Sequence, residues 1–101
     1  MRLNIAKMMK DLQKMQAQLQ AEIEELEVEA ASGGGMVTAR MSGKKELLSL
    51  TIAPDAITPD DPELLQDLII AAVNEAGRKV DQQLQEKTSS LTGGMKIPGL
   101  F

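Results

Sequence analysis

The segment from residue 26 to residue 53 constrains the fold more than any other part of this chain. Within it, apolar residues fall at every second position in three short runs. The runs cover residues 26–30, 36–41 and 47–52. Alternation of this kind is typical of β-strands that bury one face and expose the other. Because the intervening segments 32–35 and 42–45 are short and contain glycine, as hairpin turns require, the pattern predicts a three-stranded antiparallel meander.

Such a meander has two unpaired strand edges and one uncovered apolar face. That face must be covered by helices, by another sheet or by a second copy of the chain. The apolar side chains of the strands are therefore the candidates for a dimer interface. They are Val28, Val37, Ala39, Met41, Leu48, Leu50 and Ile52.

A long helical pattern precedes the meander. Apolar residues recur at spacings of three and four from Ile5 to Leu26, which predicts a helix of about 30 Å with Asn4 as its N-cap. The apolar seam of this helix fits two arrangements. It packs on the second helix of the same chain, or it forms a coiled coil with another chain.

A second helical pattern follows the meander after a proline-rich connector. Asp61 followed by Pro62 predicts the helix start, because Asp61 is a good N-cap and Pro62 has no N–H to lose at the first helical position. The apolar face of this helix continues to about residue 89. Residues 1–91 are thus expected to form a single α-β-β-β-α domain of the α+β class, and residues 92–101, which are glycine-rich and aperiodic, a flexible tail.

The composition excludes most kinds of catalytic site. The chain has no histidine, cysteine, tyrosine or tryptophan, and its one aromatic residue is Phe101. It therefore lacks the commonest general base, the thiol nucleophile and most metal ligands. We expect no enzymatic activity, no cofactor, no metal site and no small-molecule substrate. No apolar run is long enough for a membrane span, and the lack of cysteine favours a cytoplasmic protein.

Charge is distributed unevenly along the chain, whose net charge is −4. Residues 1–18 hold four basic side chains and one acid, whereas residues 22–29 hold five glutamates and residues 54–67 hold five acids. Two antiparallel helices would bring the start of the first beside the end of the second, far from the strands. We therefore expect a basic pole there. Its members are Lys7, Lys10, Lys14, Arg78, Lys79 and Lys87.

The three lysines of the first helix are spaced three and four apart, which predicts one stripe beside the apolar seam. The alternative interpretation of this stripe is a solvated helix face. If the pole binds nucleic acid, the near absence of aromatic residues removes any stacking platform for single strands or RNA loops. Binding is then expected to favour duplex phosphates, with little sequence preference and strong sensitivity to salt.

Several strings of residues, in their order and spacing, resemble the YbaB/EbfC nucleoid-associated proteins, and the resemblance covers nearly the whole chain. The strings are MKDLQKMQ at residues 9–16, EV at 27–28 followed by GGGMV at 33–37, DLIIAAVNEA at 67–76 and GMKIPG at 94–99. The resemblance implies a protomer that dimerises through its sheets, with the helices projecting like the arms of tweezers. It also implies a small bacterial protein of the cytoplasm and nucleoid that binds duplex DNA through these arms and affects nucleoid organisation or gene regulation. The same six basic residues match the arms.

A second functional hypothesis belongs to a different class. The chain has seven methionines, whose flexible side chains suit adaptable contact surfaces. A dimer with methionine-bearing helical arms is also suited to hold a protein partner between them. On this hypothesis the protein is a dimeric adaptor and not a DNA-binding protein.

Overall fold

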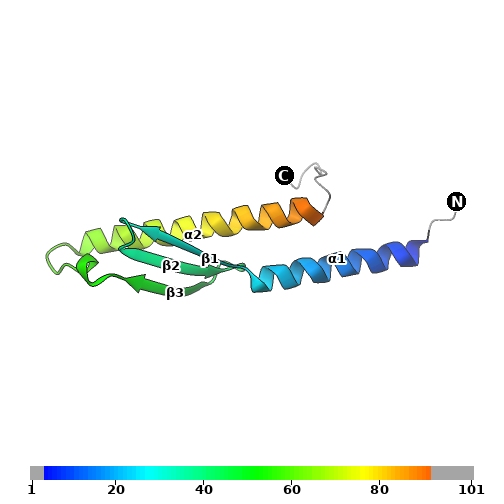
Figure 1. The fold of residues 1–101 in the computed structure, drawn as a ribbon, viewed down its shortest axis with the longest axis horizontal. Coiled ribbons are helices and arrows are strands. Elements are labelled where there is room, and N and C mark those ends of the chain that lie inside the picture. Colours follow the sequence, from blue (N-terminus) through cyan, green and yellow to red (C-terminus); the bar gives the residue numbers. More distant parts are fainter. Residues whose placement is uncertain (1–3, 92–101) are drawn as a thin grey trace.

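The structure is a computed structural model that describes residues 4–91, drawn in Figure 1. Its elements are α1 (Ile5–Glu25), β1 (Glu27–Ser32), β2 (Val37–Ser42), β3 (Leu47–Ile52), the 3₁₀ helix η1 (Pro54–Ala56) and α2 (Pro62–Leu91). This order confirms the predicted α-β-β-β-α arrangement of helices and strands. The predicted flexible tail at residues 92–101 lies outside the described residues.

The three strands form one antiparallel sheet in the order β1-β2-β3, so β2 is central and the other two are edges. The predicted alternation is confirmed in β2, where Val37, Ala39 and Met41 share one face and are all buried. The turn between β1 and β2 contains three glycines with positive φ, at residues 33–35. Glycine adopts this left-handed backbone at little cost, which explains why three occur in succession.

Helix α2 lies along one face of the sheet, above β1 and β2 (Figure 1). Ala72, Ala76 and Val80 of α2 are fully buried in a core with Ala30 of β1 and Ala39 of β2. Four of these five side chains are methyl groups, so the helix backbone lies close to the strands. A helix is about 10 Å across and strands are about 4.8 Å apart, so one helix covers two strands and leaves the third open.

Both helices begin where the sequence predicts. The side-chain Oδ1 of Asn4 accepts a hydrogen bond from the backbone N of Lys7 at 3.0 Å. Asp61 Oδ1 does the same for the backbone N of Leu64 at 3.2 Å. Each cap satisfies one of the N–H groups that the first turn of a helix leaves without a partner.

Helix α1 projects from the end of the sheet and stands clear of the other elements over most of its length (Figure 1). No residue of α1 is buried, and Leu12 in the middle of its apolar seam is 62% exposed. We call this seam, which is exposed except at the half-buried Leu19, the apolar stripe of α1. It consists of Ile5, Met8, Leu12, Met15 and Leu19. The predicted packing of the stripe on the chain's own second helix is therefore wrong, because the sheet already occupies the apolar face of α2.

The turn between β2 and β3 fixes the point at which α1 leaves the sheet. The backbone N of Gly43 donates to the carbonyl O of Leu26 at 2.9 Å, just after the last turn of α1. A Cβ at Gly43 would overlap the carbonyl O of Ile23. Only glycine allows the hairpin to approach the helix end this closely.

Candidate nucleic-acid interface

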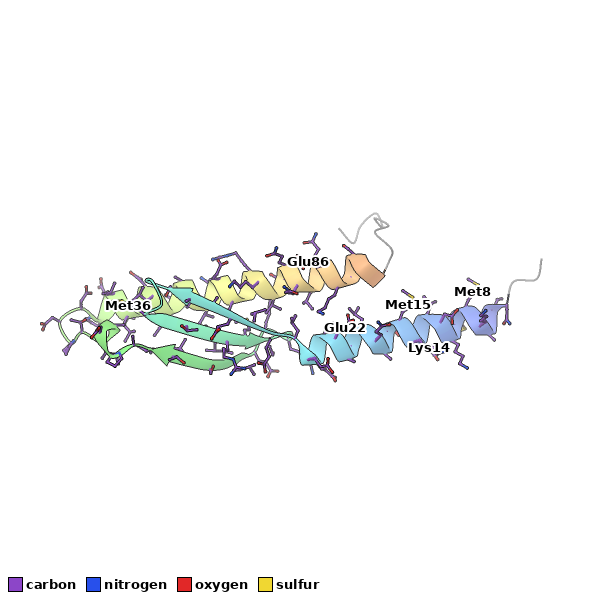
Figure 2. The ribbon with its side chains drawn as sticks, viewed as in Figure 1. Met8, Lys14, Met15, Glu22, Met36 and Glu86 are labelled. Atoms are coloured by element: carbon purple, nitrogen blue, oxygen red, sulfur yellow. The ribbon has the colours of Figure 1, made fainter. Side chains whose placement is uncertain are left out.

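The three lysines of α1 form a row on the outer side of the helix, which we call the lysine row: Lys7, Lys10 and Lys14. At about 100° per residue, the centre of this row lies about 150° around the helix from the centre of the apolar stripe. Figure 2 shows Lys14 pointing away from the side on which Met8 and Met15 lie. The predicted position beside the apolar seam is therefore corrected to the opposite side of the helix.

The side chains of the lysine row are free of ion pairs and hydrogen bonds within residues 4–91. All three are exposed. Lys7 and Lys14 are seven residues apart, which is about 10 Å along the helix axis. The row thus presents three ammonium groups without an ion-pair partner among the described residues along one line.

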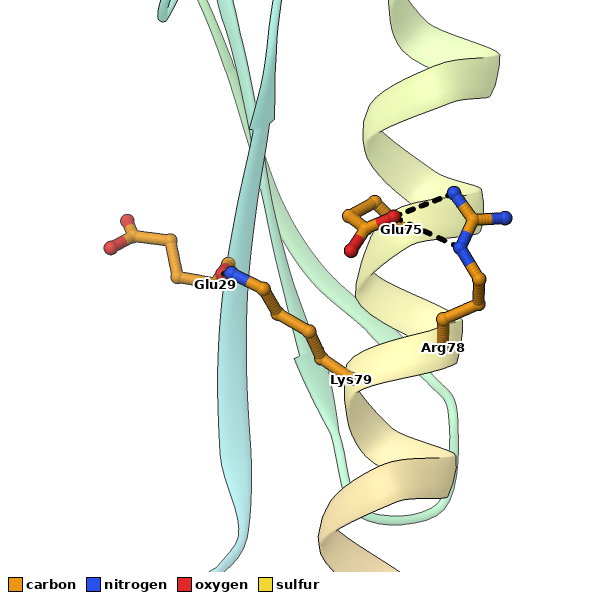
Figure 3. A network of polar contacts seen from close by, with 4 residues as sticks. All are labelled: Glu29, Glu75, Arg78 and Lys79. Atoms are coloured by element: carbon orange, nitrogen blue, oxygen red, sulfur yellow. Dashed lines mark hydrogen bonds and ion pairs between the residues drawn. The ribbon is translucent and has the colours of Figure 1, made fainter.

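Two of the predicted cations of α2 are already engaged (Figure 3). The guanidinium of Arg78 donates to Oε2 of Glu75 from Nε at 2.9 Å and from Nη2 at 2.6 Å. The Nζ of Lys79 donates to the backbone carbonyl of Glu29 on β1 at 2.8 Å. A cation that already has such a partner contributes less to the binding energy of an external anion than a cation without one.

The third predicted cation of α2 points in another direction. Lys87 is half-buried and lies seven residues after the buried Val80, which places it on the inward side of the helix. Arg78, by contrast, is two residues before Val80 and lies on the far side. The structure therefore brings together the three lysines of α1 but does not join the cations of α2 to them in one surface.

One further free cation was not predicted from the sequence. Lys44 is exposed in the β2–β3 turn and has no ion-pair partner within the described part of the chain. Its neighbour Lys45 pairs with Asp81 of α2 at 2.8 Å. The signal for Lys44 was a pair of consecutive lysines in a turn, but only the contact of Gly43 with the end of α1 shows that this turn lies at the base of the projecting helix.

The candidates for a dimer interface also separate into two groups. Val37, Ala39 and Met41 lie in the protomer's own core beneath α2, where no partner reaches them. The β3 members remain accessible: Leu48 is 47% exposed, and Leu50 and Ile52 are half-buried, as is Val28 on β1. A contact with a second copy through the apolar face of the sheet is therefore left to β3 and to Val28.

Two other kinds of site are absent from residues 4–91. No group of three or more acidic side chains there is arranged to hold a metal ion. No helix in the same range has the length and the apolar character needed to cross a membrane. Within the described residues the lysine row is the best candidate for a binding surface, and its positive charge favours an anionic ligand.

Comparison with known proteins gives consistent matches along the chain. A model of the YbaB/EbfC DNA-binding family matches residues 1–95. A nucleoid-associated protein of Alkaliphilus metalliredigens is 52% identical over 101 residues, which is 97% of this chain and 89% of the relative. One of Clostridium novyi is 49% identical over 102 residues, with 98% and 90% covered. The fold resembles the crystal structure of an uncharacterized protein of Helicobacter pylori, with a TM-score of 0.63, 25% identity and coverage of 78% of this chain and 92% of the other.

Proposed function

Because the chain belongs to the YbaB/EbfC DNA-binding family, we propose that it acts as a nucleoid-associated homodimer that binds duplex DNA with little sequence preference. The observation that carries this proposal is the lysine row, which is exposed, free of acidic partners and displayed on a projecting helix. Phosphates of a duplex are the natural partners of such ammonium groups. We assign no catalytic role to the chain.

The outer side of α1 changes the sign of its charge along its length. After the lysine row the same side continues through Ala17 and Ala21 to Glu25 at the base of the helix. The acids at the base repel phosphate, so DNA is expected to contact the N-terminal half of α1 alone. This arrangement reconciles DNA binding with a net charge of −4, because the basic half of the helix extends away from the acidic parts of the molecule.

The chemistry of the row supports low sequence preference. Lysine is a flexible point charge, whereas direct reading of bases depends largely on the paired donors and acceptors of arginine, asparagine and glutamine. The row holds none of these three residue types. Contacts to phosphate position a protein on DNA without selecting a sequence.

Two features support the homodimer. The edges β1 and β3 are unpaired, and β3 keeps apolar side chains exposed. A second copy would cover such surfaces and would double the number of lysines from three to six. We place this dimer in the cytoplasm, on the nucleoid, where it would affect DNA organisation or gene regulation.

The salt dependence of binding tests this proposal. Six lysine–phosphate contacts predict a slope of about −5 in a plot of log affinity against log salt, or about a 1,000-fold loss between 50 and 200 mM. We would measure the fluorescence anisotropy of a labelled duplex over this range, with light scattering for the oligomeric state. The variant Lys7→Gln/Lys10→Gln/Lys14→Gln is expected to bind far more weakly and to lose most of the slope.

The matched control removes three cations that are engaged in the structure: Lys45→Gln/Arg78→Gln/Lys79→Gln. It changes the net charge by the same amount but is expected to keep most of the affinity and the slope. If the lysine-row variant binds with an unchanged slope, α1 is not the DNA-binding surface. If the two triple variants lose affinity equally, net charge and not the row determines binding.

A further inference from the structure

Strand β1 is an edge of the sheet, and the register identifies the backbone groups that point outward from it. The backbone N of Gly43 donates to the carbonyl O of Leu26, in continuation of the register between β1 and β2. Bonded and non-bonded pairs alternate along an antiparallel ladder, so Glu27, Glu29 and Ala31 belong to non-bonded pairs. Their N–H and C=O groups therefore point away from β2 and are open to an added strand.

A lysine of α2 already satisfies one of these outward carbonyls. The Nζ of Lys79 donates to the carbonyl O of Glu29 at 2.8 Å, and Figure 3 shows its side chain crossing from the helix to the strand. This contact agrees with the direction that the register gives for the Glu29 carbonyl. Lys79 is exposed, and its ammonium group sits on a flexible stem, so the N–H of an added strand could take its place.

Helix α2 forms a wall along one side of the β1 edge. The Oγ of Ser32, at the end of β1, donates to the carbonyl O of Leu68 at 2.6 Å, and Lys79 reaches the middle of the strand. Leu64 precedes Leu68 by four residues, so it lies on the same side of the helix, and it is 42% exposed. An added strand would therefore turn every second side chain toward leucine and the aliphatic stem of Lys79.

The other side of the β1 edge is acidic. Glu27 and Glu29 are exposed there, on the face of the sheet away from α2. Arg40 lies opposite Glu29 in the register but pairs with Glu27. The carboxylate of Glu29 is thus left without an ion-pair partner within residues 4–91. Side chains that lie opposite each other on neighbouring strands share a face, so an added strand is favoured if it places basic side chains beside these two acids.

We propose that the free edge of β1 binds an extended basic segment of another protein, which adds to the sheet as a fourth strand. The segment carries basic side chains two positions apart, opposite Glu27 and Glu29, and apolar side chains at the positions that face α2. A second copy of the chain fits this edge less well than it fits β3, because pairing of two β1 strands brings their glutamates together. The same acids repel the phosphates of DNA.

The β1 edge is a different surface from the lysine row and from the space between the helical arms that the adaptor hypothesis assigns to a partner. Binding at β1 needs neither DNA nor the lysine row, so it goes beyond the proposed function and does not depend on it. With phosphate on the lysine row and the segment on β1, one chain would join duplex DNA to a second, basic protein.

Amide hydrogen exchange of the whole chain, followed by NMR, tests this site with a peptide of sequence TKVKVKT as the probe. In the free protein the outward N–H groups of Glu27, Glu29 and Ala31 are expected to exchange fast, whereas those of Val28 and Ala30 bond to β2 and exchange slowly. Saturating peptide is expected to slow the three outward groups by about tenfold or more.

Two results of this exchange measurement would overturn the proposal. Fast exchange of the three outward groups at saturating peptide would show that the peptide binds elsewhere. Slow exchange of the same groups without peptide would show that a second copy already occupies the edge, and the proposed dimer would then still stand.

Altered peptides separate strand addition from attraction between charges. The peptide TEVEVET reverses the charges and is expected to bind at least about tenfold more weakly. Two further peptides keep the charges of TKVKVKT but carry backbone N-methyl groups, one on its lysines and the other on its valines. An antiparallel added strand donates to β1 from the lysines and a parallel one from the valines, so at least one of the two is expected to lose binding. If both bind as tightly as TKVKVKT, charge alone holds the peptide and the proposal is wrong.

Variants of the protein locate the contact on the edge. Glu29→Gln is expected to weaken binding of TKVKVKT by about two- to fivefold. The matched control, Asp11→Asn, removes one carboxylate from the projecting helix α1 and is expected to leave binding unchanged at about 150 mM salt, where distant charges are screened. Ala31→Pro removes one outward donor while the ladder to β2 stays intact, and is expected to weaken binding by about fivefold. Equal losses in Glu29→Gln and Asp11→Asn would mean that net charge determines binding, against the proposal.

Discussion

Replacing Gly43 with alanine is expected to destabilise the protein, although alanine usually favours the folded state over glycine. The added Cβ would overlap the carbonyl O of Ile23 and would lie 3.1 Å from the Cβ of Leu26. Loss of freedom in the unfolded chain contributes about 0.4–1 kcal/mol of stability, but an overpacked site costs about 1–3 kcal/mol. The obstacle is backbone at the end of α1, which no change of rotamer removes, so the upper end of the cost applies. We expect a net loss of about 2 kcal/mol.

Gly77→Ala is the matched control, because the chemical change is the same and the surroundings are open. Nothing lies within 4 Å of the new Cβ, and alanine is better than glycine by about 1 kcal/mol in a helix interior. Urea unfolding followed by far-ultraviolet circular dichroism, at one protein concentration for all samples, should therefore move the two variants in opposite directions. A Gly43→Ala protein as stable as the wild type would contradict this reasoning, since the approach of the hairpin to α1 would then not require glycine.

Three further outcomes follow from single contacts. Asp61→Ala should lower the free energy of unfolding by about 1 kcal/mol through loss of the α2 cap, while the neighbouring Asp60→Ala should change it by less than about 0.5 kcal/mol in the same urea assay. Ser32→Ala should cost about 1 kcal/mol, because its hydroxyl donates to a carbonyl of α2 at 2.6 Å. Lys10→Gln should weaken duplex binding in 50 mM salt by about tenfold or more, whereas Arg78→Gln, whose guanidinium is paired, should leave it within about twofold by anisotropy.

The parts of the fold that the sequence predicts are those with local causes. The caps at Asn4 and Asp61 act on backbone groups within three residues, and both helices begin where these residues place them. The alternation in β2 is likewise a property of six consecutive residues. The bounds of β1 and β2 differ from the predicted 26–30 and 36–41, and β1 begins one residue later than predicted because Leu26 is the C-cap of α1.

The sequence does not predict which elements of the chain pack on each other. The spacing of apolar residues in α1 predicts that the helix has an apolar side. Which element covers this side depends on how all the other apolar surfaces of the chain pack. In the structure the sheet packs on the apolar face of α2, and no described element covers most of the apolar stripe of α1. The predicted basic pole does not form for a similar reason, since the Nζ of Lys79 donates to the backbone carbonyl of Glu29, fifty residues away in the sequence. Linear charge patterns do not show such pairings.

The position of the lysine row, in contrast, is contained in the sequence. Each lysine follows a residue of the apolar stripe by two positions, as Lys7 follows Ile5 and Lys10 follows Met8. Two residues turn a helix by about 200°, so the two sets must lie on nearly opposite sides. It follows that any surface that covers the apolar stripe turns the lysines outward. Burial of α1 and contact with phosphate are then compatible, and the packing that holds the helix also orients its charge.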